Sequence, residues 1–186
     1  MNYLHDNDDA RRWAWLALLN TASVLLSLPF SCVAPFVALV TLAGLNMNRT
    51  DAFLLAGAVF LANQATGFGF LGYSLKFSTI AWGVAMGIGC MLAVWAAFET
   101  ARYAAGKSPL LRVLLTFTAA CLVWQATMSV TAAMLSPHGA FNGRIIANMV
   151  AINAGSLLLL LGLQYAGQRL GIAPRARHAL TGTARA

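Results

Sequence analysis

The sequence consists mainly of long apolar runs without charge, separated by short polar connections. The run at residues 78–98, for example, contains no Asp, Glu, Lys or Arg. A helix needs about 20 such residues to cross the hydrocarbon core of a bilayer. Charged residues make up only 9% of the chain and hydrophobic residues 60%, whereas about a quarter of a soluble domain is charged. We therefore expect an all-α integral membrane protein, because the runs are also too long for barrel strands.

The 186 residues leave room for five or six membrane helices and no separate soluble domain, at about 20 residues per helix. We expect a polar N-terminal tail at residues 1–12, a transmembrane domain at 13–170 and a basic C-terminal tail at 171–186. Within the domain, Pro29 and Pro35 indicate a tight turn, and Thr50-Asp51 resemble a helix N-cap. The expected helices cover residues 13–28, 35–45, 51–66, 78–104, 110–135 and 141–170.

The distribution of basic residues predicts how the helices are oriented. With six helices, ten of the twelve Lys and Arg residues fall on one side and two on the other. By the positive-inside rule, both termini are then cytoplasmic. The net charge of +7 therefore reflects orientation and contact with anionic lipid, and it does not predict a nucleic-acid partner. The larger set is Arg11, Arg12, Arg49, Arg102, Lys107, Arg112, Arg169, Arg175, Arg177 and Arg185, and the smaller set is Lys76 and Arg144.

The polar stretch at residues 63–73 is the strongest candidate for a binding site. Asn63 and Gln64 are adjacent at the end of an apolar run, where unpaired amides are costly. Glycines then free the backbone to leave helical geometry, and aromatic residues offer flat apolar faces. One interpretation is the wall of a ligand site, and the other is a helix end with an Asn-Gln cap and an interfacial aromatic belt. The glycines are Gly67, Gly69 and Gly72, and the aromatic residues are Phe68, Phe70 and Tyr73.

Further polar residues fall on the same, outer side of the expected bundle. Arg144 and Asn148 lie one helical turn apart, which places them on one side of the sixth helix. Arg144 is either an interfacial stop-transfer charge or a partner for an anionic group such as a phosphate. Cys32 and His138 are the outward candidates for reaching a transition metal in a ligand, although both are also ordinary turn residues.

The sequence contains no recognisable catalytic motif. The histidines, at positions 5, 138 and 178, lie in tails or turns, so haem ligation between helices is not expected. Asp51 and Glu99 are expected at the interface, Glu99 in an i,i+3 pair with Arg102. No nucleophile–base arrangement, zinc-protease motif or phosphate loop occurs. We therefore expect a binding protein without a cofactor of its own.

These features resemble a known family. Six helices in under 200 residues, cytoplasmic termini and an outward pocket resemble the substrate-binding (S) components of energy-coupling-factor (ECF) vitamin transporters. The stretch Asn63-Gln64-x-x-Gly67-Phe68-x-x-Leu71-Gly72-Tyr73, followed by Ala81-Trp82-Gly83, is similar to the BtuM-like branch associated with cobalamin.

The resemblance implies capture of a vitamin, with cobalamin or another corrinoid favoured, by a multi-pass protein of the bacterial cytoplasmic (inner) membrane. Transport would use a coupling subunit and two ATPases, or a solitary mode. A corrinoid is compatible with the candidate residues: its amides suit Asn63, Gln64 and Asn148, its phosphate suits Arg144, and its ring suits Phe68, Tyr73 and Trp82.

Two other functions remain open. The first is a non-catalytic helical subunit or assembly factor of a larger membrane complex. That function would use the close-packing GxxxG face formed by Gly83 and Gly87. A membrane enzyme acting on lipid ranks last, because no acid–base pair is evident.

Overall fold

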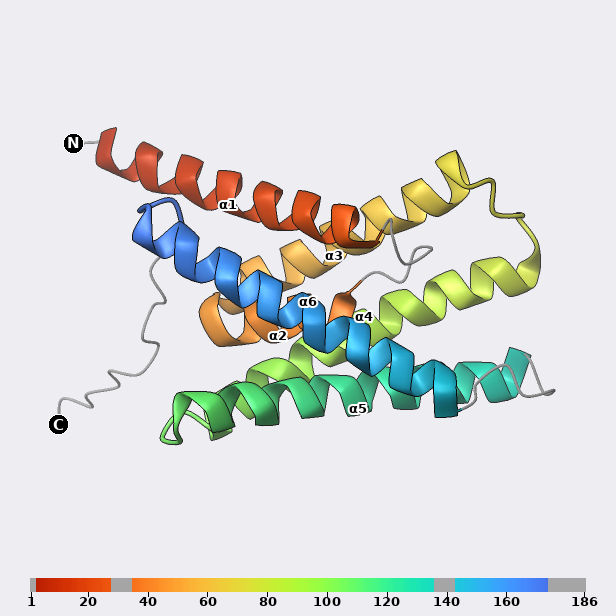
Figure 1. The fold of residues 1–186 in the computed structure, drawn as a ribbon. Coiled ribbons are helices and arrows are strands. Elements are labelled where there is room, and N and C mark those ends of the chain that lie inside the picture. Colours follow the sequence, from red (N-terminus) through yellow and green to blue (C-terminus); the bar gives the residue numbers. More distant parts are fainter. Residues whose placement is uncertain (1–2, 28–34, 136–142, 174–186) are drawn as a thin grey trace, which may run out of the picture.

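The computed structural model of the protein describes residues 3–27, 35–135 and 143–173, and all regular structure in these ranges is helical (Figure 1). The all-helical class is thus confirmed for this part of the chain. Four helices are long and apolar enough to cross a membrane: α3 with its π-helical extension, α4, α5 and α6. The elements are α1 (Tyr3–Ser27), α2 (Phe36–Asn46), α3 (Arg49–Ala65), the π-helical segment η2 (Thr66–Phe70), α4 (Phe77–Tyr103), α5 (Pro109–Leu135) and α6 (Gly143–Arg169).

The short helix α2 lies at the centre of the bundle, among the longer helices (Figure 1). It packs against α3, α4, α5 and α6, and every residue from Phe36 to Gly44 is buried. Its 11 residues span about 16 Å, roughly half the thickness of a bilayer core. The apolar composition that predicted this helix therefore reflects burial in protein on all sides.

A buried amide from α6 satisfies the start of α2. The first backbone N–H groups of a helix have no partner within the helix, and Pro35 provides no side-chain cap. Asn153, only 5% exposed, accepts a hydrogen bond from Ala38 N at 3.2 Å. Its Nδ2 donates to the carbonyl of Met149 at 2.9 Å. Both ends of this carboxamide are thus used, which identifies Asn153 as a structural residue.

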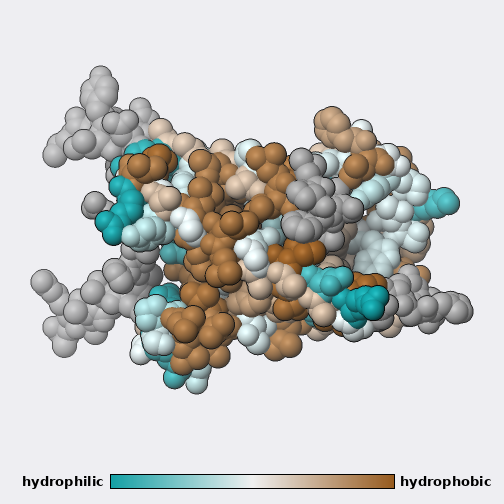
Figure 2. Space-filling view, in the orientation of Figure 1, coloured by the Kyte–Doolittle hydropathy of each residue, from teal (hydrophilic) through white to brown (hydrophobic). Residues whose placement is uncertain are grey.

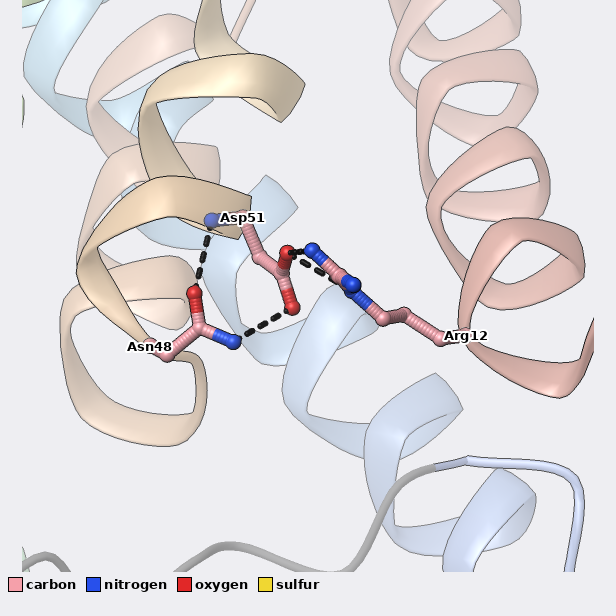
Figure 3. A network of polar contacts seen from close by, with 3 residues as sticks. All are labelled: Arg12, Asn48 and Asp51. Carbon is pink, nitrogen blue, oxygen red and sulfur yellow. Dashed lines mark hydrogen bonds and ion pairs between the residues drawn. The ribbon is translucent and has the colours of Figure 1, made fainter. Parts of the chain in front are cut away.

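Helix α1 begins at Tyr3, ten residues before the predicted start at residue 13. Its polar first half is held by a contact far along the chain (Figure 3). Arg12 Nε donates to Asp51 Oδ1 at 2.8 Å, and a second guanidinium nitrogen pairs with the same oxygen. Because this charge pair ties α1 to α3, the stretch predicted as a tail is an ordered helix from Tyr3 onward.

The predicted N-cap of the third helix is wrong by two residues. The cap is Asn48, whose side-chain oxygen accepts from Asp51 N at 2.8 Å. Asn48 Nδ2 in turn donates to Asp51 Oδ2 at 2.8 Å, so the N-cap side chain is bonded to both the backbone and the carboxylate of Asp51 (Figure 3). Asp51 is therefore buried at 7% exposure, with its charge balanced by Arg12, and does not lie at a free interface.

Charged residues gather at one end of the bundle. Glu99 pairs with Arg102 at 2.9 Å, which confirms the predicted i,i+3 pair, and with Arg49 of α3 at 3.3 Å. Arg11 donates to the carbonyl of Gly171, just beyond α6. The α3–α4 connection and the start of α6 lie at the opposite end (Figure 1). In Figure 2, hydrophobic residues cover much of the middle, and hydrophilic residues gather toward the two ends.

Candidate functional site

The end of α3 changes geometry at the glycine–aromatic stretch. After Ala65 the chain forms the π-helical segment η2, in which Leu71 N donates to the carbonyl of Thr66 at 3.0 Å. Gly72 then adopts a left-handed φ of +66°, a conformation that glycine adopts without steric cost. The expected departure from α-helical geometry is confirmed, and it returns the chain toward α4.

This turn packs one aromatic residue over a glycine. Tyr73 N donates to the carbonyl of Gly67 at 3.1 Å, and a Cβ added at Gly67 would lie 2.7 Å from the Tyr73 ring. The ring also meets Phe68 edge-on, with centroids 6.2 Å apart and an interplanar angle of 81°. Such T-shaped pairs are favourable, so the turn presents a fixed aromatic wall.

A cavity of about 270 Å³ opens beside this wall, between α3 and α4. Five of the seven residues predicted to bind substrate line it. Three more lining residues, Ser78, Thr79 and Met86, were missed. Ser78 and Met86 each lie four residues from the predicted Trp82, a spacing that places side chains on one helix face. The lining residues are Asn63, Gln64, Phe68, Tyr73, Ser78, Thr79, Trp82 and Met86.

The two adjacent carboxamides each bury an unpaired polar atom. Asn63 Oδ1 and Gln64 Nε2 are inaccessible to solvent and have no hydrogen-bond partner among the residues that the structure describes. Leaving one such atom unsatisfied costs about 1–3 kcal/mol. Asn153 shows that the same bundle satisfies a structural amide completely. Asn20, Gln125 and Gln164 also bury an unpaired side-chain atom, so the feature that distinguishes Asn63 and Gln64 is that both line the cavity.

The GxxxG face of α4 brings the two walls of the cavity together. A Cβ added at Gly83 would lie 3.2 Å from Gln64 Oε1, and one at Gly87 would lie 3.0 Å from the ring of Phe60. Both glycines therefore face α3 within the chain, as expected for close helix packing. This contact fixes where the Gln64 carboxamide lies.

In the described part of the chain, no charged side chain lines the cavity. The other two predicted residues, Arg144 and Asn148, are exposed at the start of α6 and do not line the cavity. Cys32 and His138 lie outside the described residues. Within residues 3–27, 35–135 and 143–173, no three His, Cys, Asp or Glu side chains form a possible metal site. The chemistry of this cavity is therefore hydrogen bonding and aromatic contact.

Comparison with known proteins neither supports nor opposes the resemblance to vitamin transporters, since no protein-family model, curated protein or solved structure matches the chain.

Proposed function

We propose that the protein is a membrane-embedded substrate-binding component of a transporter, and that it captures a vitamin-class molecule in the cavity between α3 and α4. One observation carries the proposal: two neighbouring carboxamides, each with a buried unpaired atom, line a cavity with an aromatic wall. Buried polar atoms in native proteins are normally paired, so exceptions call for an explanation. A ligand supplies one if the Asn63 and Gln64 side chains turn toward the cavity when it binds, because the two unpaired atoms then gain hydrogen-bond partners.

The lining favours a neutral, planar ring with a carbonyl or ring-amide edge. A carboxamide offers one acceptor and two donors, and it can pair twice with an edge that presents a donor beside an acceptor, as Asn and Gln do with adenine. Phe68, Tyr73 and Trp82 provide flat surfaces for such a ring. The absence of charge from the lining disfavours an ionised group, which would lose its hydration without gaining a partner.

Cobalamin remains the ligand proposed from the resemblance, but compact ring vitamins rank ahead of it. Ligand pockets measure about 300–1,000 Å³, and this cavity lies just below that range at about 270 Å³. It suits one ring system or a side amide of a corrinoid rather than a whole corrinoid. Arg144, proposed for the phosphate, does not line this cavity, so that part of the corrinoid argument does not apply here.

The proposed setting is a six-helix bundle in the bacterial cytoplasmic membrane, with both termini in the cytoplasm and the cavity near the outer face. The gathering of Arg12, Arg49 and Arg102 at one end, away from the α3–α4 connection, supports this orientation. Movement of the ligand would then depend on an ECF coupling subunit with its ATPases, or on a solitary mode. We propose no enzymatic reaction for the chain.

Direct binding tests the proposal. Purified protein in lipid nanodiscs would be titrated with riboflavin, a neutral ring amide, and with cyanocobalamin. The Asn63→Leu variant should bind the preferred compound about tenfold more weakly or worse, which corresponds to about 1.4 kcal/mol. Asn148→Leu, the same change outside the cavity, should bind like wild type. Equal affinity in Asn63→Leu and wild type would show that the compound does not bind in this cavity.

The alternative function, a helical subunit of a larger complex, now has less support. It relied on Gly83 and Gly87 as an open docking face, and both glycines pack against α3 instead. Stable co-purification with partner proteins, together with no binding of either compound, would favour it over ligand capture.

A further inference from the structure

An apolar groove of about 650 Å³ runs along the outside of the α3–α4 pair. One edge of its lining is a stripe on α4, Ile80, Val84, Ile88 and Leu92, whose members are four residues apart and 45–56% exposed. From Ile80 to Leu92 the stripe extends along about 18 Å of helix. The remaining lining residues are Phe60, Gln64, Phe68, Leu75, Gly83, Gly87 and Met91.

The groove and the polar cavity share two residues. Gln64 and Phe68 line both, so a molecule seated on the carboxamides has the groove directly beside it. The cavity lining is rich in hydrogen-bonding groups and the groove lining is almost wholly apolar. The cavity thus offers a polar compartment for a ring, and the groove offers an adjoining apolar channel.

Two other occupants fit the groove less well. A bilayer phospholipid can cover the groove with an acyl chain, but its charged headgroup would find no charged side chain in the adjoining cavity, so it would leave the cavity's carboxamides unpaired. A partner helix would dock best on small residues that allow close approach. Gly83 and Gly87 already meet Gln64 and Phe60 of α3, which leaves branched side chains on the outside.

We infer that the ligand is a neutral amphiphile, with its ring in the cavity and an apolar chain lying along the groove. This inference rests on the proposed function and names the substrate class more narrowly: a carbonyl-bearing ring with an alkyl or prenyl chain. The chain would enter from the bilayer, so the ligand would reach the cavity sideways between α3 and α4.

A ring-matched pair of probes tests the inference in nanodiscs. One probe is a dimethoxy-methyl-benzoquinone and the other is the same quinone with a decyl chain. Equilibrium dialysis against empty nanodiscs corrects for partition into lipid. We expect the decyl compound to bind at least about tenfold more tightly, a free-energy difference of about 1.4 kcal/mol.

Two substitutions then test where the decyl chain of the probe lies. Val84→Trp fills the middle of the groove at a position 56% exposed, and should reduce the affinity of the decyl compound to that of the bare ring. Leu158→Trp adds the same side chain at an exposed position of α6, 72% exposed, and should have no effect. Gln64→Leu should weaken the binding of both probes, because a quinone carbonyl only accepts hydrogen bonds and Gln64 Nε2 is the unpaired donor.

The possible outcomes distinguish the inference of an amphiphilic ligand from the proposed capture of a ring. Equal affinity of the two probes, or a chain advantage that survives Val84→Trp, would overturn the amphiphile and leave ring capture standing. Capture of a bilayer phospholipid or a partner helix in the groove, with ring binding unchanged, would do the same. If the protein binds neither quinone, and also binds neither riboflavin nor cyanocobalamin, the proposed function and this inference are both overturned.

Discussion

Replacing Asn63 by leucine should make the empty protein more stable, although it removes a polar residue and weakens binding. Asn63 Oδ1 is buried without a partner, at a cost of about 1–3 kcal/mol. Leucine has a similar size and carries no such cost. The net gain should be about 1–2 kcal/mol, because leucine must still fit the cavity wall. A chain of this size gains roughly 2–4 °C in Tm per kcal/mol.

The matched control is the same substitution at Asn153. That side chain accepts from Ala38 N and donates to Met149 O, so Asn153→Leu leaves a buried donor unpaired at the start of α2. The expected loss is about 1–3 kcal/mol. The assay is unfolding of the ligand-free variants in detergent micelles, followed by circular dichroism. If Asn63→Leu loses as much stability as Asn153→Leu, Asn63 is a structural amide and the binding argument fails.

Two further substitutions test contacts that hold the bundle. Gly167→Ala should destabilise by about 1–3 kcal/mol, because its Cβ would lie 2.6 Å from the Trp15 ring. Gly162→Ala on the same helix meets nothing within 4 Å and should stabilise by up to about 1 kcal/mol; equal effects in thermal unfolding would refute the packing argument. Asp51→Asn should cost about 1–3 kcal/mol, less than a fully buried pair, because the Arg12 side chain is 33% exposed and keeps some hydration. A double-mutant cycle with Arg12→Gln measures the coupling, and a coupling near zero would show that the pair does not tie α1 to α3.

The long helices were predictable because their ends are marked in the sequence. α4 and α5 begin and end within a residue of expectation, since their uncharged runs stop at polar connections. The start of α1 was not marked, because its polar first half lacks a membrane signal. Its partner, Asp51, lies 39 residues beyond Arg12, and no local pattern announces such a contact.

The predicted binding residues likewise divide into those placed by local geometry and those placed by packing between distant helices. Asn63, Phe68, Tyr73 and Trp82 come from one continuous stretch with a single turn, so their proximity follows from local geometry. Arg144 belongs to α6, whose rotation is set by packing against the rest of the bundle. The sequence can place it near one end of a helix but cannot say which neighbour its side chain faces.

The dependence of α2 on Asn153 has a consequence for how the protein is made. The cap is synthesised 115 residues after the amide that it satisfies, which at bacterial elongation speeds of about 5–20 residues per second is a delay of roughly 6–23 s. During that interval the second helix is too short to hold a place across the bilayer by itself. The start of α2 can therefore be capped only after α6 has been synthesised. A ribosome that stalls before residue 153 leaves the first turn of α2 without this hydrogen bond.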